Sequence, residues 1–206
     1  IAHQYLATQK EKDLTNEKNW MIISNGVTDI QSKEFQYVLN HKKDFEAVVG
    51  EKRVTRKLAN IVTESLKPLV ENLDTLNYYK QRPIAKSDNI RTTDSLIFTY
   101  DLVITEASEN WKKYSEFSKE SIQKFAWENP SLIKEIAMNY EKNIADKSKL
   151  NDAITWMNRS LELSNSYDGL SLMSKLYSKT NAKDQAISYA KKARKFGDDL
   201  GVKPDE

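Results

Sequence analysis

Glycine and proline are scarce in this chain, and their scarcity limits the folds that it can adopt. Five glycines and four prolines occur among 206 residues, against about 12% of an average protein. β-Sandwiches and barrels need many tight turns, which these two residues usually supply. Charged residues make up 30% of the chain and apolar ones 39%, a balance that suits a folded protein covered by amphipathic helices. The sequence therefore predicts a soluble all-α protein.

The residue types that most often carry catalysis and metal binding are also scarce. The chain has no cysteine, which excludes disulfides, thiol catalysis and thiolate metal sites. Its two histidines, His3 and His41, lie far apart in the sequence and form no cluster. The glycines form neither a phosphate-cradling loop nor a Gly-x-Ser-x-Gly elbow. We therefore predict no catalytic residue, no cofactor and no metal in this chain, and only a site assembled from distant acids stays open for hydrolysis.

The charges of the chain are nearly balanced. The 32 basic and 30 acidic residues are interspersed and leave a formal charge of +2, which is too little for a dedicated nucleic-acid binder. No apolar run approaches the roughly 20 residues that a membrane helix needs. The chain begins at Ile1 without a signal-like segment, so we expect a processed chain or a piece of a longer one.

Apolar spacing predicts several short helices and one long helix in the first half of the chain. Ser32, three residues before Phe35, is typical of an N-cap. Gly50 is expected just past a helix end, because glycine accepts positive φ at no steric cost. Pro68 lacks a backbone donor and should end or bend the long helix. The expected helical segments are residues 2–12, the stretch with Trp20, Ile23 and Val27, the turn at Phe35, Val38 and Leu39, residues 44–49 and residues 54–66.

A predicted loop at residues 80–89 divides the chain. We expect an N-terminal helical segment, residues 1–90, and a repeat-like part, residues 91–206, which together form one continuous domain. Asp94 is expected to cap a helix whose apolar residues are spaced by one, three, three, one and three, as on a helix face and unlike a strand. Those residues are Leu96, Ile97, Tyr100, Val103, Ile104 and Ala107. Another helix is expected from about Ser108 to Asn129.

The strongest pattern lies between residues 168 and 196. Large, small and aromatic residues follow one helical face, and small residues follow a second face beyond a short turn at residues 180–182. The pattern predicts antiparallel helical hairpins whose small residues let the helix axes approach closely. The positions expected to pack are Leu170, Met173, Ser174, Tyr177, Ala186, Ala190 and Ala193. This spacing resembles a tetratricopeptide repeat, which implies a right-handed stack of hairpins.

A weaker copy of the same pattern lies upstream. Its first helix would carry Ile133, Ile136, Ala137 and Tyr140, and its second helix Ala153, Met157 and Ser160. Tyr140 and Ala153 are thirteen residues apart, whereas Tyr177 and Ala186 are nine apart. We therefore expect about one extra helical turn or a longer connection at residues 146–149.

The combination of the N-terminal half with a repeat-like tail resembles a known helical region. The residues that carry this resemblance are Asn19-Trp20, Ile22-Ile23, Val27-Thr28-Asp29, Ser32 to Phe35 with Tyr37, then Asn40, Phe45, Gly50 and Val54. The chain is similar to the C-terminal helical region of thioredoxin-family proteins of the Bacteroidetes envelope. The resemblance implies a periplasmic or envelope location and a redox domain upstream. The Cys-x-x-Cys of that family is absent here, so no catalytic residue is carried over.

Two classes of function follow from these patterns. The first is a noncatalytic interaction module that binds a protein or peptide on the helical face not used in hairpin packing. Its candidate partner-binding residues are Asn139, Asn143, Lys175 and Lys179. The second is a structural extension of a thiol-disulfide oxidoreductase that forms a homodimer. Its buried apolar stripe would consist of Leu69, Leu73 and Leu76.

Other polar groups have ordinary explanations. His41 lies beside two lysines and has no sequence neighbour for a ligand pair. Asp198 and Asp199, near Glu206, lack the alternating ligands of a calcium loop and suit a solvated tail. An aromatic and basic cluster could stack bases or receive a partner's apolar anchor, but we favour the explanation that one tyrosine is core and the rest form a helix end. That cluster is Tyr78, Tyr79, Lys80 and Arg82.

Overall fold

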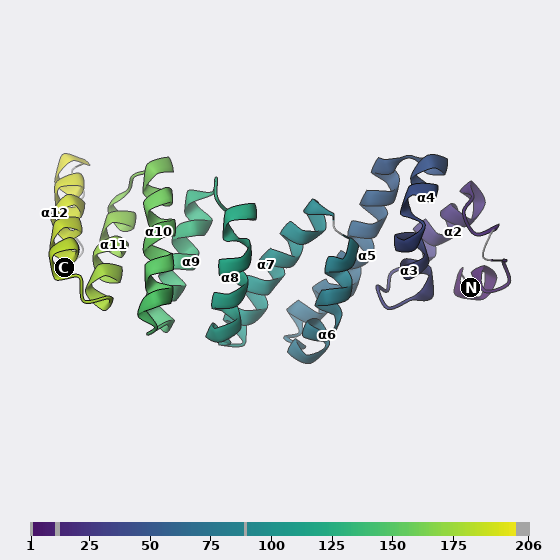
Figure 1. The fold of residues 1–206 in the computed structure, drawn as a ribbon, viewed down its shortest axis with the longest axis horizontal. Helices are drawn as coiled ribbons and strands as arrows, with labels where there is room; N and C mark the ends of the chain where they lie inside the picture. Colours follow the sequence, from purple (N-terminus) through teal and green to yellow (C-terminus); the bar gives the residue numbers. More distant parts are fainter. Residues whose placement is uncertain (1, 11–12, 89, 201–206) are drawn as a thin grey trace. The chain divides into compact units, whose positions relative to one another are not determined.

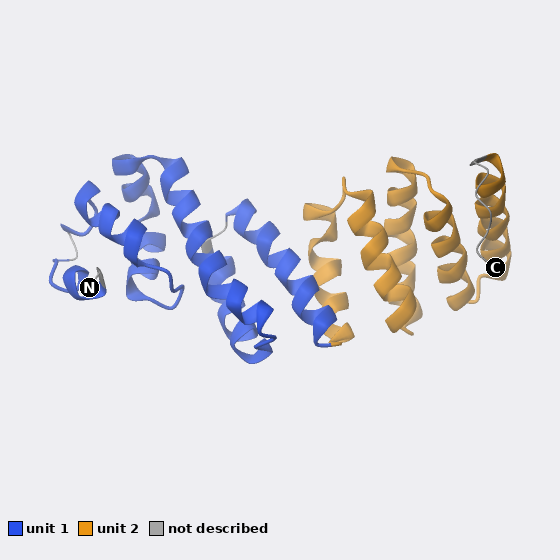
Figure 2. Ribbon diagram, turned by 180° about the vertical axis from the view of Figure 1, so that it is seen from behind, with its two compact units in different colours: residues 1–108 blue, residues 109–206 orange. Residues whose placement is uncertain are grey.

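The computed structural model describes residues 2–10, 13–88 and 90–200. Within these ranges the regular secondary structure is entirely helical, which confirms the predicted all-α class (Figure 1). The chain forms two compact units, residues 1–108 and residues 109–206 (Figure 2). The units divide after residue 108 and not at the predicted division after residue 90, because the helix at 91–107 packs against helices of the first unit.

Unit 1 is built around one long helix. Its elements are α1 (Ala2–Leu6), α2 (Glu17–Gly26), α3 (Lys33–Asn40), α4 (Lys42–Val49), α5 (Glu51–Glu71), α6 (Thr75–Ala85), η2 (Lys86–Asp88) and α7 (Arg91–Ala107). Helix α5 packs against α4, α6 and α7. Its fully buried Leu58, Ile61 and Leu66 recur at helical spacing, so that one face of α5 lies in the core of the unit.

Local capping places several predicted boundaries where the sequence indicated them. The Ser32 side chain accepts a hydrogen bond from the Phe35 N–H at 3.1 Å, at the start of α3. Gly50 has φ of 89° between α4 and α5, a conformation that residues with a Cβ rarely adopt. Helix α7 begins at Arg91, ahead of the predicted cap Asp94. Helix α1 ends at Leu6, earlier than expected, and Thr8 donates its hydroxyl to the Tyr5 carbonyl there.

Two prolines lie inside helices: Pro68 does not end its helix, one of the two effects expected of it, and Pro83 lies where a loop was predicted. Helix α5 continues through Pro68 to Glu71, and Pro83 lies inside α6, where a loop was expected. A proline costs one backbone hydrogen bond, and burial of apolar side chains beyond it can offset that loss. Val70 is buried after Pro68, and Ala85 is buried after Pro83. Residue 89 of the predicted loop lies outside the described residues.

The predicted apolar stripe of three leucines is not continuous. Leu69 is half-buried near the end of α5, and Leu73 follows in a turn with φ of 52°. Leu76, in the first turn of α6, is 78% exposed. The stripe fails because α5 ends at Glu71, so the three leucines do not share one helical face.

Unit 2 consists of consecutive helices joined by short connections. They are α8 (Trp111–Phe125), α9 (Pro130–Asn143), α10 (Lys147–Leu163), α11 (Tyr167–Lys179) and α12 (Lys183–Leu200). Figure 1 shows α9 to α12 side by side, and each packs against the next. Asn129 caps α9 through the Leu132 N–H, with Pro130 at the first helical position, where a proline is best tolerated.

The α11–α12 hairpin brings together most of the residues expected to pack there. Leu170, Met173 and Ala193 are buried. The Ser174 hydroxyl donates to the Ala186 carbonyl at 2.8 Å, and the Tyr177 and Tyr189 rings stack with centroids 5.4 Å apart. Ala190 is exposed, contrary to prediction. It lies beside the helical line through residues 186, 189, 193 and 197, which faces α11, so nothing in α11 covers it.

The upstream pair of helices buries all seven of its predicted positions. Ile133, Ile136, Ala137 and Tyr140 of α9 and Ala153, Met157 and Ser160 of α10 are buried. The extra length before Ala153 lies mainly in the helix, since α10 begins at Lys147 and Ala153 is its seventh residue. Ala186 is only the fourth residue of α12. The added turn starts where predicted, at residues 146–149, and Asp146 caps it.

Candidate functional site

The structure brings two of the four predicted partner-binding residues into one pocket. Asn143 and Lys179 line a pocket of about 300 Å³ in unit 2. Its complete lining, named here the α9–α10 pocket, is Lys142, Asn143, Ile144, Ala145, Leu150 and Lys179. Lys175 is exposed on α11 and is not among the lining residues. Asn139 is buried, and its Nδ2 donates to the Tyr114 hydroxyl at 3.0 Å, so the expectation that it faces a partner is wrong.

The connection between α9 and α10 shapes this pocket. Helix α9 ends at Asn143, and Ile144 turns to an extended conformation while its N–H donates to the Tyr140 carbonyl at 3.0 Å. Ile144 and Leu150 are buried, at 7% and 1% exposure, and supply apolar atoms to the pocket. Asp146 caps the next helix by accepting from the Ser148 N–H at 2.8 Å. The pocket therefore has a fixed apolar base, because caps hold the chain on both sides of it.

Positive charge lines the opening of the pocket. Lys179, at the end of α11, lies 3.4 Å from the Glu141 carboxylate and also donates to the Glu141 carbonyl. Lys142 is exposed, and within the described residues its side chain has no hydrogen bond or ion pair. The lining contains no acidic residue. The Asn143 Nδ2 donates one N–H to the Asn139 carbonyl at 3.1 Å and keeps a second. This second N–H and the Lys142 ammonium lie beside apolar atoms and can bind a carboxylate that carries a hydrocarbon stem.

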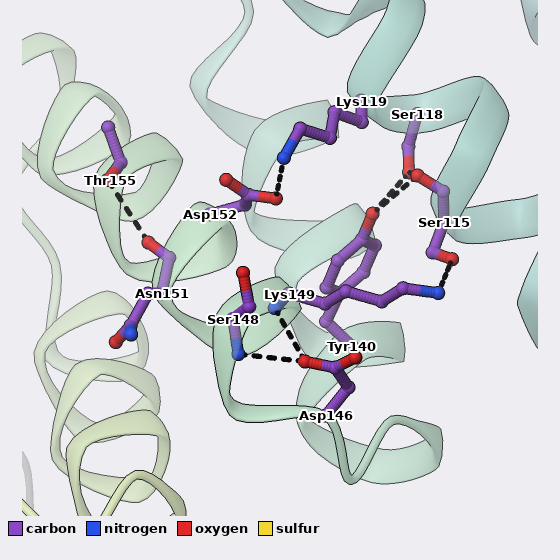
Figure 3. A network of polar contacts seen from close by, with 10 residues as sticks. All are labelled: Ser115, Ser118, Lys119, Tyr140, Asp146, Ser148, Lys149, Asn151, Asp152 and Thr155. Carbon is purple, nitrogen blue, oxygen red and sulfur yellow. Dashed lines mark hydrogen bonds and ion pairs between the residues drawn. The ribbon is translucent and has the colours of Figure 1, made fainter.

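A network of polar contacts joins α8, α9 and α10 (Figure 3). The Tyr140 hydroxyl lies 2.7 Å from the Ser118 hydroxyl and donates to the Ser115 carbonyl at 3.0 Å. The Lys149 ammonium donates to the Ser115 hydroxyl at 2.6 Å. Burial raises the pKa of Tyr140, so its hydroxyl stays protonated at neutral pH. These bonds fix α8, α9 and α10 to one another.

Unit 1 contains a second buried polar cluster that sequence reasoning missed. Arg82 of α6 donates through Nε and Nη2 to the two oxygens of Asp101 of α7, each at 2.7 Å. The Tyr78 hydroxyl donates to the same carboxylate at 2.7 Å. Asp101 is 1% exposed. Burial raises the pKa of Asp101, while the hydrogen bonds and charge of Arg82 oppose that change.

This cluster confirms the expected core tyrosine, and it engages the basic group that was considered for a partner surface. Tyr78 is fully buried, and Arg82 is committed to Asp101. Burial raises the pKa of Tyr78, and the charge of Asp101 adds to the effect. A signal was present in the sequence, since Tyr78 and Arg82 are spaced four residues apart on one helix side and Asp101 interrupts an apolar face. A charged residue on such a face indicates a buried pair.

The remaining polar candidates are separate from both clusters. The His41 ring stacks on Tyr37, with centroids 4.2 Å apart, and its Nδ1 lies 3.2 Å from Asp44. Asp198 and Asp199 are exposed, and Glu206 lies outside the described residues. In the part of the chain that the structure describes, no group of three or more histidine or acidic residues is placed to hold a metal ion.

No known protein family, curated protein or solved structure matches this chain. None of the described helices combines the length and hydropathy needed to cross a membrane. The class that the structure defines is an all-helical protein of adjacent packed helices.

Proposed function

We propose that this chain is a noncatalytic helical interaction module that binds a peptide or another protein domain. The observation that carries the proposal is the α9–α10 pocket, where Lys142 and Lys179 lie beside the buried Ile144 and Leu150. Interaction sites combine an apolar anchor pocket with charged groups that orient the partner. Hydrogen bonds from Asn139 and Tyr140 to α8 hold α9, which contributes Lys142 and Asn143 to the pocket.

The repeat-like packing supports the same function. Two successive hairpins, α9–α10 and α11–α12, bury helix residues at related positions, such as Ile136 and Met173 on their first helices. We propose that they stack in a right-handed manner, as tetratricopeptide repeats do, and that the pocket between successive hairpins receives the partner. Lys179 reaches from α11 to Glu141 of α9, so the pocket draws side chains from both hairpins.

The ligand that fits this pocket is a carboxylate on a peptide. The Lys142 ammonium favours a negative charge, Lys179 shares its charge with Glu141, and Asn143 offers an uncharged polar group. A volume of about 300 Å³ accommodates a side chain or the last residue of a chain. We therefore expect the partner to present Asp, Glu or a C-terminal carboxylate next to an apolar residue.

The wider setting comes from the resemblance in sequence alone. We propose that the module follows a thioredoxin-like redox domain and works in the periplasm or cell envelope. The segments that carry that resemblance include Trp20 with Ile23 and Ser32 with Phe35, which lie in the core or at a cap of unit 1. In this setting the module would position a partner for the redox domain without reacting itself.

A second candidate function is that of a dimerising extension of a thiol-disulfide oxidoreductase. Leu76 is 78% exposed and Leu73 is 47% exposed, which favours an apolar contact near the start of α6. If this contact forms the dimer, we expect Leu76→Lys to weaken self-association by more than about tenfold, because burying one leucine contributes about 1.5–3 kcal/mol. Sedimentation velocity measures the change. A wild-type chain that is monomeric at every concentration removes this alternative.

The first experiment for the interaction module is a selection from a random peptide library on the intact chain. We expect the selected peptides to share an acidic residue or free C-terminal carboxylate beside an apolar residue, because these groups match the pocket. Selected peptides that compete with one another identify a single site. A library that yields no binder, or only basic peptides, contradicts the proposal.

A further inference from the structure

A second pocket, in unit 1, gathers positive charge. It lies between α2 and α5 and has a volume of about 370 Å³. Its lining, named here the α2–α5 pocket, is Trp20, Met21, Ser24, Arg53, Arg56, Lys57 and Asn60. The four residues from α5 are spaced by three, one and three, so they share one face of the helix. All three charged residues of the lining are cations.

The three cations have no acidic partner in the described part of the chain. Within it, the side chains of Arg53, Arg56 and Lys57 form no ion pair and no hydrogen bond. Lys57 is 8% exposed. Burial lowers the pKa of Lys57, and the nearest opposing effect comes from the charge of Glu64 on the same helix. A buried charge without a partner lowers the stability of a fold, so its presence in a pocket indicates a binding role.

We propose that the α2–α5 pocket binds the phosphate monoester group of a small molecule. A phosphate monoester carries nearly two negative charges and three peripheral oxygens, which match two guanidinium groups and one ammonium. A single carboxylate has one charge and two oxygens, which one arginine satisfies. This inference uses residues of unit 1 only and does not depend on the function proposed for unit 2.

The uncharged side chains of the pocket supply polar groups, apolar surface and a packed wall. The Ser24 hydroxyl donates to the Met21 carbonyl at 3.0 Å, so its proton is already engaged. Asn60 is exposed and supplies an amide group at the pocket. Met21 is 64% exposed and offers apolar surface to the organic part of the ligand. Trp20 packs on Phe45, with ring centroids 5.5 Å apart, and holds the pocket wall in place.

The test is isothermal titration calorimetry of the intact chain with O-phosphoserine, inorganic phosphate and serine. We expect O-phosphoserine and phosphate to bind and serine not to bind. Replacing Arg53→Gln or Arg56→Gln should weaken O-phosphoserine binding by about tenfold or more, since hydrogen bonds to charged groups are among the strongest. Lys52→Gln is the matched control, because Lys52 is exposed next to Arg53 but does not line the pocket.

Lys57→Met provides a readout that a purely structural lysine would not give. Methionine keeps an unbranched stem and removes the buried charge, so we expect a higher melting temperature together with lost phosphate binding. If Lys52→Gln and Arg56→Gln weaken O-phosphoserine binding equally, the binding depends on the overall charge of the protein and not on the pocket. That result would overturn the proposal. The absence of phosphate binding, or binding only to vesicles that contain phosphatidic acid, would overturn it as well.

Discussion

Replacing Arg82 with methionine is expected to lower the free energy of unfolding of unit 1 by about 3–5 kcal/mol. The Asp101 carboxylate accepts both guanidinium hydrogen bonds at 2.7 Å and is almost fully buried. Without Arg82, that charge would keep the Tyr78 hydroxyl as its hydrogen-bond donor and the charge of Lys86 nearby, and it would lose both guanidinium hydrogen bonds. Urea denaturation, combined with amide hydrogen exchange in α6 and α7, measures the loss.

A double variant and a control separate the effect of the lost ion pair from the effect of the lost side chain. The double variant Arg82→Met with Asp101→Leu removes both charges, and we expect it to recover most of the stability. Lys67→Met is the control, because the pair of Lys67 with Glu71 is exposed and contributes little. If Arg82→Met costs no more than Lys67→Met, the buried cluster does not stabilise the packing of α6 on α7.

Tyr140→Ala is expected to destabilise unit 2 by about 3–5 kcal/mol, as for other buried aromatic residues. Tyr140 is 1% exposed, and its ring contacts the Trp156 ring at a centroid distance of 5.1 Å in an edge-to-face arrangement. Truncation would leave a cavity between α9 and α10 and remove the hydroxyl from the Ser118 and Ser115 contacts. Urea denaturation, with hydrogen exchange in α8 to α10, measures the change.

The conservative variant Tyr140→Phe divides this effect into two parts. It keeps the ring and removes only the hydroxyl, so we expect a loss of about 1–2 kcal/mol from the broken hydrogen bonds. Ile187→Ala is the control, since Ile187 is 55% exposed on α12. A Tyr140→Phe loss as large as that of Tyr140→Ala would mean that the polar network, and not the ring packing, joins the helices.

The helices were largely predictable because their apolar residues recur at helical spacing. The segment that contains Ile97 and Ile104 is rich in β-branched residues, yet its period indicated the helix that α7 forms. The helix does not end at Pro68, and Pro83 lies in a helix instead of the predicted loop, because local rules count a lost hydrogen bond and cannot weigh the burial of Val70 or Ala85. Tertiary packing decided those boundaries.

The sites were less predictable, since they depend on which helices become neighbours. Asn143 and Lys179 were expected near a partner and share a pocket, but Asn139 belongs to the core because Tyr114 of α8 packs over it. Asp101 of α7 pairs with Arg82 of α6, and residue spacing within one helix cannot predict a contact between two helices. Charged residues on apolar helix faces, such as Asp101 and Lys57, were the signal that sequence reasoning should have used.

The most direct test of the interaction module is the affinity of a selected acidic peptide for charge-reversed variants of the α9–α10 pocket. We expect Lys142→Glu with Lys179→Glu to weaken binding by at least about tenfold, because the positive charge at the pocket becomes negative and repels an acidic peptide. Lys191→Glu, an exposed position of α12 outside the pocket, should change the affinity much less. Equal affinities for the wild type and the pocket variant, with both folded by circular dichroism, would contradict the proposed binding site.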